Sequence, residues 1–463
     1  MPRALGLTYS PPASRRAVCD RTGGLINRAA DERIEIGRLI DSRPMSRAQV
    51  LVIFLCALVM VVDGYDIQVM ALAVPALTRD WNVAPARFGL ALSAVVIGLT
   101  AGSGLLGPLA DRFGRRTVLL ASMCVVGLTT ACTALAATPQ QFVGWRLATG
   151  LALGAGIPSC AALTSEYAPA AYRSFLMGVL NIGSPLGAFA AGFVAPPILE
   201  TLGWRGTFLV GGAAPLLLAA LAVAAPESLK FLAIRRPASP RFARTLQRIV
   251  PGAEPAAIYA QHVASRTGAA LLGPLRAPFR PRTLLLWALV ALNQFNLYIL
   301  VSWLPTLLQQ SGWTLAQALR GAVLIQAGGV AGGLAIARLM DLGATRPTLA
   351  SGFLLSGACL ALFAVVPSGA AWVALLLLLG AGVSGSQLGI NILSVAYYPP
   401  AIKATGVSWA IVVGGIGAVL GPLAGARFID LQLAPGAILA LLALPSLASA
   451  AGVLLMRREW QAH

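Results

Sequence analysis

Charged residues are scarce in this chain of 463 residues. Only 11% of them are Asp, Glu, Lys or Arg, whereas a soluble globular protein carries about 25%. Hydrophobic residues make up 57% of the chain, and its mean hydropathy is +0.79. Long runs without charge are typical of membrane-spanning helices. The scarcity of charge therefore argues against a soluble protein and predicts an all-α membrane protein.

Histidine and paired cysteines are also scarce. The chain has two histidines, His262 and His463, and six cysteines, none of which forms a CxxC pair. Five of the cysteines lie in apolar segments, where they are expected to pack as small apolar residues. With no HExxH motif, no histidine cluster and no GxSxG with partners, we predict no metal site, no cofactor, no disulfide framework and no enzymatic activity.

Acidic residues are outnumbered, since 34 Lys and Arg face 16 Asp and Glu and give a net charge of +18. The basic residues stand between apolar segments and form no basic arm or face, so we predict that no nucleic acid is bound. The first 47 residues are polar and contain no apolar core before a cleavage site, which predicts a cytoplasmic tail and no signal peptide.

Apolar segments of about 20 residues, the length of a membrane-spanning helix, recur along the chain. We predict twelve spans: 48–72, 88–110, 117–137, 142–165, 175–198, 206–225, 283–308, 316–340, 347–367, 371–394, 405–428 and 433–456. A long polar segment divides them six and six. The predicted organisation is a tail (1–47), a first half (48–225), a central loop (226–282), a second half (283–456) and a second tail (457–463).

The basic residues also predict the orientation. With the N-terminus inside, 28 of the 34 Lys and Arg fall on the cytoplasmic side, as the positive-inside rule requires. Both tails and the central loop are then cytoplasmic. Two groups of six spans joined by a basic loop are typical of the major facilitator architecture, in which two halves rock about a site at the membrane midplane.

The segment after the second span, GPLADRFGRR at 107–116, resembles the signature loop of the major facilitator superfamily. We assign gating to Gly107, which allows close packing, to Asp111, whose charge suits a helix N-terminus, and to Gly114 and Arg115. A weak echo of this loop, Asp341 to Arg346, follows the eighth span. The alternative interpretation of the segment is an ordinary positive-inside turn.

Two aspartates, Asp63 and Asp66, stand in the middle of the first span. Residues three apart lie near one face of a helix, and a charge inside a membrane usually marks an ion or substrate pathway because it costs roughly 2.5–3.5 kcal/mol on insertion scales. Burial beside a second carboxylate favours protonation, and no histidine lies in a span. We predict that this pair carries protons; the alternative is a structural ion bridge with arginine.

Other polar residues within the spans are candidates for substrate binding. Arg146, near the outer end of the fourth span, either pairs with one of the aspartates or holds an anionic substrate. Gln387 and Asn391 lie at i and i+4 on one helix face and suit hydrogen bonding to a small polar ligand, although such amides also serve as glue between helices. We add three candidates from the second half: Asn293, Tyr298 and Trp409.

Several stretches together resemble the aromatic acid:proton symporter family of the major facilitator superfamily. They include DGYD at 63–66, the loop at 107–116, RLATGLALGAGIPSCAALTSEYAP at 146–169, PESLKFL at 226–232 and YYPPAIKATGVSWA at 397–410. The resemblance extends from about residue 33 to 456. It assigns transport roles to Asp63 and Asp66 and gating to the loop. We place three further charged residues with the gating group: Glu166, Arg173 and Lys403.

The resemblance implies a monomeric importer of the bacterial inner membrane that takes up an aromatic carboxylate, such as benzoate or a hydroxybenzoate, with protons. Two departures bear on the substrate. Gly414 and Gly415 stand where family members often carry an arginine, and the echo of the signature loop is degraded. The alternatives are proton-coupled transport of another small organic anion, export, or a sensor descended from a transporter.

Overall fold

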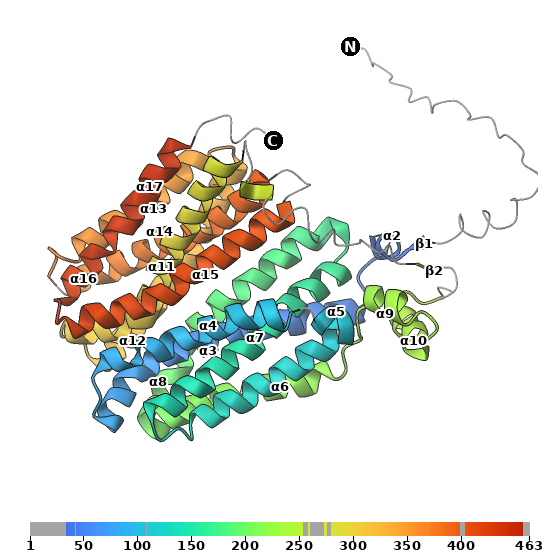
Figure 1. Cartoon of the computed structure of the whole chain (residues 1–463), viewed down its shortest axis with the longest axis horizontal. Helices are drawn as coiled ribbons and strands as arrows, with labels where there is room; N and C mark the ends of the chain where they lie inside the picture. The colour runs from blue at the N-terminus through green and yellow to red at the C-terminus, as the bar shows by residue number, and fades with distance from the viewer. Residues whose placement is uncertain are drawn as a thin grey trace, which may run out of the picture.

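The computed structural model describes residues 34–41, 43–107, 109–252, 258–259, 273–275, 279–367, 369–398 and 403–456. Long helices dominate these residues. We call the end of the helical bundle where α3 begins and α17 stops the termini end, and the opposite end the far end. In Figure 1 the first half runs from blue to green and the second half from yellow to red.

The first half is built from long helices joined by short turns. It comprises α3 (Arg47–Trp81), η1 (Pro85–Phe88), α4 (Gly89–Leu105), α5 (Leu109–Phe113), α6 (Arg115–Thr133), α7 (Pro139–Tyr167) and α8 (Ala170–Ala222). A capping box at Ser46 and Gln49 starts α3, which satisfies two backbone donors that helix geometry leaves free. Gly203, with φ 66° and ψ −171°, breaks the helical geometry of α8 and divides it into two spans.

The second half repeats this pattern. It comprises α11 (Arg280–Gln310), α12 (Leu315–Asp341), α13 (Thr345–Leu362), α14 (Ala370–Tyr397), α15 (Lys403–Asp430), α16 (Pro435–Leu441) and α17 (Ala443–Leu455). Thr314 and Gln317 form a second capping box at the start of α12.

The predicted spans agree with these helices. Within the described residues, ten helices are long and apolar enough to cross a membrane. One of them, α8, contains two predicted spans on either side of Gly203. The remaining predicted span, 347–367, falls on α13, whose first residues, Thr345 to Thr348, are polar. Each of the twelve predicted spans therefore lies on a helix, and the all-α prediction is confirmed.

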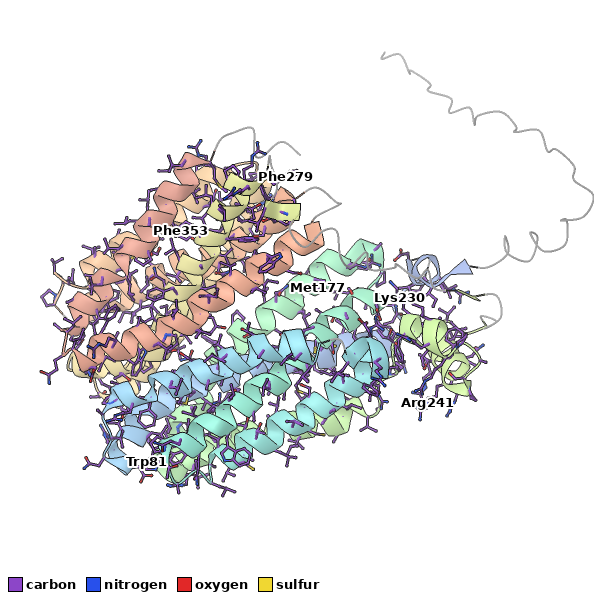
Figure 2. The ribbon with its side chains drawn as sticks, in the orientation of Figure 1. Trp81, Met177, Lys230, Arg241, Phe279 and Phe353 are labelled. Atoms are coloured by element: carbon purple, nitrogen blue, oxygen red, sulfur yellow. The ribbon has the colours of Figure 1, made fainter. Side chains whose placement is uncertain are left out.

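A small cap covers the termini end of the first half. It contains β1 (Ile34–Glu35), α2 (Ile36–Asp41), α9 (Leu229–Arg235), α10 (Pro240–Ile249) and β2 (Ile258–Tyr259), and β1 pairs with β2 in parallel. The short helix η3 (Gly273–Leu275) lies instead against α11 and α15 of the second half. Apolar side chains of α2, α9 and α10 are buried together with those of α3 and α7. Figure 2 shows Lys230 and Arg241 of this cap beyond the helices, and Trp81 at the far end.

The two halves meet chiefly through α3 with α11, α4 with α15, and α8 with α12. At the far end, a Cβ added to Gly89 of α4 would lie 2.4 Å from the Ala426 Cβ of α15. One turn further along α4, the Ser93 hydroxyl donates to the Val419 carbonyl at 2.9 Å. The halves are thus in close contact at the far end of the bundle.

Candidate functional site

The DGYD run lies where α3 and α8 touch backbone to backbone. A Cβ on Gly64 would lie 1.8 Å from the Ser184 carbonyl oxygen, and a Cβ on Gly187 would lie 1.8 Å from the Val61 carbonyl oxygen. No larger residue fits either position without separating the helices. The two glycines therefore fix α8 beside the aspartates of α3.

Asp66 forms a buried ion pair with Arg146 of α7. The Arg146 Nη1 and Nη2 atoms donate to the two carboxylate oxygens at 2.9 and 2.7 Å, and Nη2 also reaches the Asp66 carbonyl at 3.2 Å. Thr130 of α6 donates a further hydrogen bond at 3.2 Å. The Arg146 and Asp66 side chains are 0% and 2% exposed. Such bidentate, fully buried pairs are strong and geometrically specific.

Arg146 has little freedom beyond this pair. Its guanidinium lies over the Phe208 ring, 5.6 Å from the ring centroid, and its buried Nε has no hydrogen-bond partner. Of the two roles considered for Arg146, pairing with an aspartate is the one that the structure contains. Phe208 and Thr130, which surround the pair, were not singled out from the sequence because an apolar span gives no signal for them.

Asp63 lies in a different environment. It is 4% exposed, and its Oδ1 atom has no hydrogen-bond partner. Ser184 provides a side-chain hydrogen bond, and the Tyr298 phenol of the second half interacts electrostatically with the carboxylate. One aspartate of the predicted pair is thus paired with arginine. The other, Asp63, has no cation partner among the described residues and lies near Tyr298 of the second half.

The candidate residues of the second half form a hydrogen-bonded chain of amides. The Asn293 amide donates to the Gln387 Oε1 at 2.8 Å and to the Val383 carbonyl at 3.2 Å. The Gln387 amide in turn donates to the Asn391 Oδ1 at 3.1 Å. Burial decreases along the chain, from the buried Asn293 to the exposed Asn391. These three amides therefore form a row of polar groups that runs from the interior toward the termini end.

Trp409 lies apart from these amides. It packs on Trp287 of α11, with the ring centroids 5.7 Å apart, about two turns from the termini ends of α15 and α11. Near Gly414, where a Cβ would lie 3.4 Å from the Gln294 Cγ, the Gln294 Oε1 is buried without a partner. The neutral amide of Gln294 therefore lies beside the glycine that stands where family members often carry an arginine.

The predicted gating residues gather at the termini end of the first half. Arg115 pairs with Asp111 at 3.1 Å and with Glu166 at 3.4 Å. The Asp111 side chain is 74% exposed and lies in the first turn of the short helix α5. Gly107 lies in the turn between α4 and α5, and a Cβ there would approach the Ser103 carbonyl to 2.4 Å.

Glu227, from the PES motif, completes this cluster. Its carboxylate accepts from the backbone N–H groups of Arg116 at 2.9 Å and Thr117 at 3.3 Å, and so caps the N-terminus of α6. Gly114 has a φ of +105°, and a Cβ there would lie 2.4 Å from the Glu227 Oε2. Ser228 donates to Glu166. Glu227 was noted in the sequence only as part of the PES motif, and nothing in that motif indicates that it caps α6.

Two predicted gating residues lie outside this cluster. Arg173, at the start of α8, pairs with Asp41 of the cap at 3.6 Å, and Asp41 also accepts from the Ala170 N–H at 2.7 Å. Lys403 begins α15, but its side chain lies outside the described residues, as do His262 and the tail from residue 457 onward.

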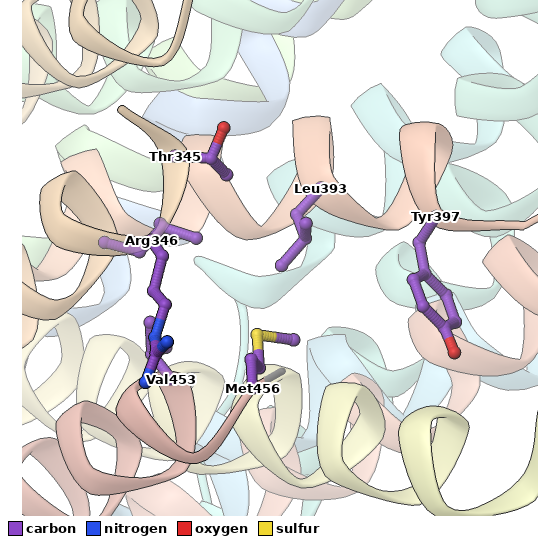
Figure 3. Close-up of a pocket in the computed structure, with 7 residues that line it drawn as sticks. Thr345, Arg346, Leu393, Tyr397, Val453 and Met456 are labelled. Atoms are coloured by element: carbon purple, nitrogen blue, oxygen red, sulfur yellow. The ribbon is translucent and has the colours of Figure 1, made fainter. Parts of the chain in front are cut away.

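A small pocket lies at the termini end of the second half, between α13, α14 and α17 (Figure 3). Thr345, Arg346, Leu349, Leu393, Tyr397, Val453 and Met456 line it. Burial raises the pKa of Tyr397 to about 12, so this phenol is neutral near pH 7. The volume of about 10 Å³ holds roughly one water molecule, so an aromatic acid does not fit there.

Comparisons with known proteins place these features in a family. The model of the Major Facilitator Superfamily matches residues 56–422. The gallate transporter of Pseudomonas putida is 34% identical over 430 residues, which cover 92% of this chain and 95% of that protein. The 4-hydroxybenzoate transporter PcaK of Pseudomonas aeruginosa is 35% identical over 436 residues, covering 92% and 96%.

Solved structures share the fold. The crystal structure of a D-xylose-proton symporter superposes with a TM-score of 0.69 at 17% identity and covers 89% of this chain and 99% of that one. The inward-open xylose transporter XylE from E. coli gives a TM-score of 0.68 at 18% identity, covering 88% and 96%. At this identity, the likeness concerns the fold alone.

Proposed function

The chain belongs to the major facilitator superfamily, and from this premise we propose that it imports an aromatic carboxylate with protons by alternating access. The chain is a transporter and not an enzyme, as its relatives and its fold are. The observation that carries the substrate class is full-length similarity to transporters of gallate and 4-hydroxybenzoate. Both compounds are small aromatic acids.

The proposed orientation places the termini end in the cytoplasm and the far end outside the inner membrane. It is supported by the sequence, in which 28 of the 34 basic residues fall in segments predicted to be cytoplasmic. The cap adds to this support, since Arg241, Arg244 and Arg248 are exposed on α10. In this orientation the contact of Gly89 with Ala426 lies on the outer side, which supports an inward-facing state.

In the proposed mechanism, Asp63 and Asp66 have separate tasks. Asp63, buried and without a cation partner, takes up a proton from outside, because a neutral carboxyl is far less costly to bury than a charged one. The Asp66–Arg146 pair is already neutral. A protonated Asp63 then removes the repulsion that a substrate carboxylate would meet beside α3, and this couples proton and substrate.

The amides of the second half are proposed to bind the substrate. Asn293 and Gln387 supply hydrogen-bonding groups near the middle of the bundle, and Tyr298 lies close enough to Asp63 to interact with its charge. Asn391, at the exposed end of the chain of amides, lies on the exit route to the cytoplasm.

The test is uptake into proteoliposomes that contain the purified protein. Radiolabelled 4-hydroxybenzoate, gallate, benzoate and succinate are offered with and without an imposed pH step, acidic outside. We expect accumulation of at least one aromatic acid only with the pH step, and none of succinate. Uptake of succinate alone would contradict the aromatic class, and accumulation that ignores the pH step would contradict proton coupling.

A further inference from the structure

Two carboxamide groups meet across the boundary between the halves. The Nε2 of Gln326, on α12, donates to the Oε1 of Gln68, on α3, at 3.4 Å. The residues are 8% and 2% exposed. Within the described residues, this is the one hydrogen bond that joins a side chain of the first half to a side chain of the second. Neither residue was singled out from the sequence.

The amide pair lies between the aspartates and the far end. Gln68 follows Asp66 by two residues along α3, in the direction of Trp81. On the other side, Gln326 follows Val323 by one turn of α12, and Val323 packs so closely on α8 that a Cβ added to Gly192 would lie 2.0 Å from its Cγ2. The three helices α3, α8 and α12 therefore converge at this level, between the aspartates and the far end.

A buried amide needs a partner, and here the partner depends on the state of the transporter. An unpaired amide buried in an apolar environment is unfavourable, because it loses the hydrogen bonds that water would provide. In the present state the two glutamines pair with one another. Alternating access requires α3 and α12 to separate at the far end, which breaks this hydrogen bond. Both amides then face whatever enters from that side.

We propose that Gln68 and Gln326 form an outer subsite for the carboxylate of the incoming aromatic acid. Each carboxamide has two N–H donors, and a carboxylate accepts hydrogen bonds at both oxygens. When the far end is open, the amides donate to the substrate; when it closes, they pair with one another as the substrate moves inward. This inference rests on the proposed function and adds residues that bind the substrate on one side of the membrane.

The substitution Gln68→Glu separates this role from that of a simple latch. Gln68 is the acceptor of the bond, so a glutamate preserves the contact with Gln326 but brings a negative charge to the subsite and removes two donors. A latch between helices would tolerate the change. A subsite for a carboxylate would not, because like charges repel.

The measurement is transport of 4-hydroxybenzoate in proteoliposomes of known orientation, as uptake from the outer side and as efflux from the inner side. We expect Gln68→Glu and Gln326→Leu to raise the KM for outer substrate about tenfold, and to change the KM for inner substrate less than twofold. Gln310→Leu, an exposed amide at the end of α11, serves as the matched control and retains both values.

Equal changes on the two sides, or an outer KM within twofold of the wild-type value for Gln68→Glu, would overturn the subsite. Thermal unfolding of each purified variant checks that it is folded, and the conservative Gln326→Asn, which retains the donors, should restore part of the outer affinity. Wild-type protein that takes up no aromatic acid would instead contradict the proposed function, so the two failures are distinguishable.

Discussion

At the scale of single residues, the two aspartates of α3 differ most in what neutralises them. The Arg146 Nη2 lies 2.7 Å from the Asp66 Oδ2. Asp63 instead lies near Ser184 and the Tyr298 phenol, and its Oδ1 has no hydrogen-bond partner among the described residues. The guanidinium compensates the charge of the Asp66 carboxylate. A buried carboxyl without a cation is the group that can gain and lose a proton as the cavity changes its access.

We therefore predict that Asp63→Asn uncouples transport. Asparagine mimics the protonated carboxyl, so substrate still binds and exchanges across the membrane, but a pH step no longer drives accumulation. The measurement compares uphill uptake with counterflow of labelled substrate in proteoliposomes. We expect uphill uptake to fall at least tenfold while counterflow persists. Uphill uptake at the wild-type level would show that the proton travels by another route.

The buried ion pair predicts a different response for Arg146. Removing one partner of a buried pair leaves an uncompensated charge, which typically costs 3–5 kcal/mol. We expect Arg146→Gln to lower the thermal unfolding midpoint in detergent strongly, and Arg146→Gln combined with Asp66→Asn to recover part of the loss. A double variant less stable than the single one would argue against the pairing as the cause.

At the scale of helices, the contact of α3 with α8 depends on the absence of side chains. A methyl group on Gly64 would lie 1.8 Å from a backbone oxygen of α8, and backbone cannot move aside as a flexible side chain can. Overpacking of this kind costs about 1–3 kcal/mol. We expect Gly64→Ala to lower the unfolding midpoint by several degrees and to impair transport.

Gly178, on the same helix α8, provides the control for that prediction. A Cβ at Gly178 would meet nothing within 4 Å, so Gly178→Ala should leave both stability and transport near wild type. If the two alanine variants behave alike, the helix contact is not the reason for glycine at residue 64.

The capping of the α6 N-terminus by Glu227 gives a second prediction at the scale of helices. Glu227 places a negative charge at the first turn of α6, where a charge of this sign stabilises a helix by about 0.3–2 kcal/mol. We expect Glu227→Gln to lower the unfolding midpoint by a few degrees without raising the KM for substrate. The exposed Glu200 is the control, and an equal loss in Glu200→Gln would exclude the capping effect.

Hydropathy predicted the helices well, because lipid offers no hydrogen bonds. The backbone N–H and C=O groups of an apolar segment must therefore bond to one another, as they do in a helix. Hydropathy predicted their ends less well. The first span was predicted to stop at residue 72, yet α3 continues to Trp81, because the apolar run reaches Leu77 and Pro75 does not end the helix. The kink in α8 corresponds to the polar gap between the predicted spans 175–198 and 206–225, where Glu200 and Arg205 flank Gly203. Hydropathy could not show that the backbone stays helical on both sides of this gap.

The charged residues of the candidate site could be predicted from the sequence, but which of them form an ion pair could not. Rare charges within apolar spans identified Asp63, Asp66 and Arg146. Which aspartate the arginine meets depends on how α7 packs against α3, and the arginine is 80 residues away from its partner in the chain. Uncharged partners such as Gln68 and Gln326 escaped notice, because a single amide in a span is usually glue between helices.

At the scale of the whole molecule, the contact of the halves at the far end predicts how the transporter can be biased. Gly89 of α4 lies against Ala426 of α15, and even a methyl group there would lie 2.4 Å from the alanine Cβ. A large side chain at this position acts as a wedge that forces the halves apart on the outer side. We expect Gly89→Trp to shift the population from the inward-facing to the outward-facing state.

The measurement is the distance between spin labels at the far ends of the two halves, by double electron–electron resonance. Labels are attached through Arg79→Cys and Arg320→Cys, both exposed sites, after the surface thiol Cys124 has been replaced by alanine. The wedge should lengthen this distance and slow uptake. A destabilisation of the inward-facing state by about 1.4 kcal/mol is enough to change the ratio of outward-facing to inward-facing molecules tenfold. Gly104→Trp is the control on the same helix, because a Cβ at Gly104 meets nothing within 4 Å. If Gly89→Trp leaves the distance unchanged, the contact at the far end does not hold the transporter in its inward-facing state; if Gly104→Trp lengthens it equally, the effect comes from bulk on α4 and not from the interface.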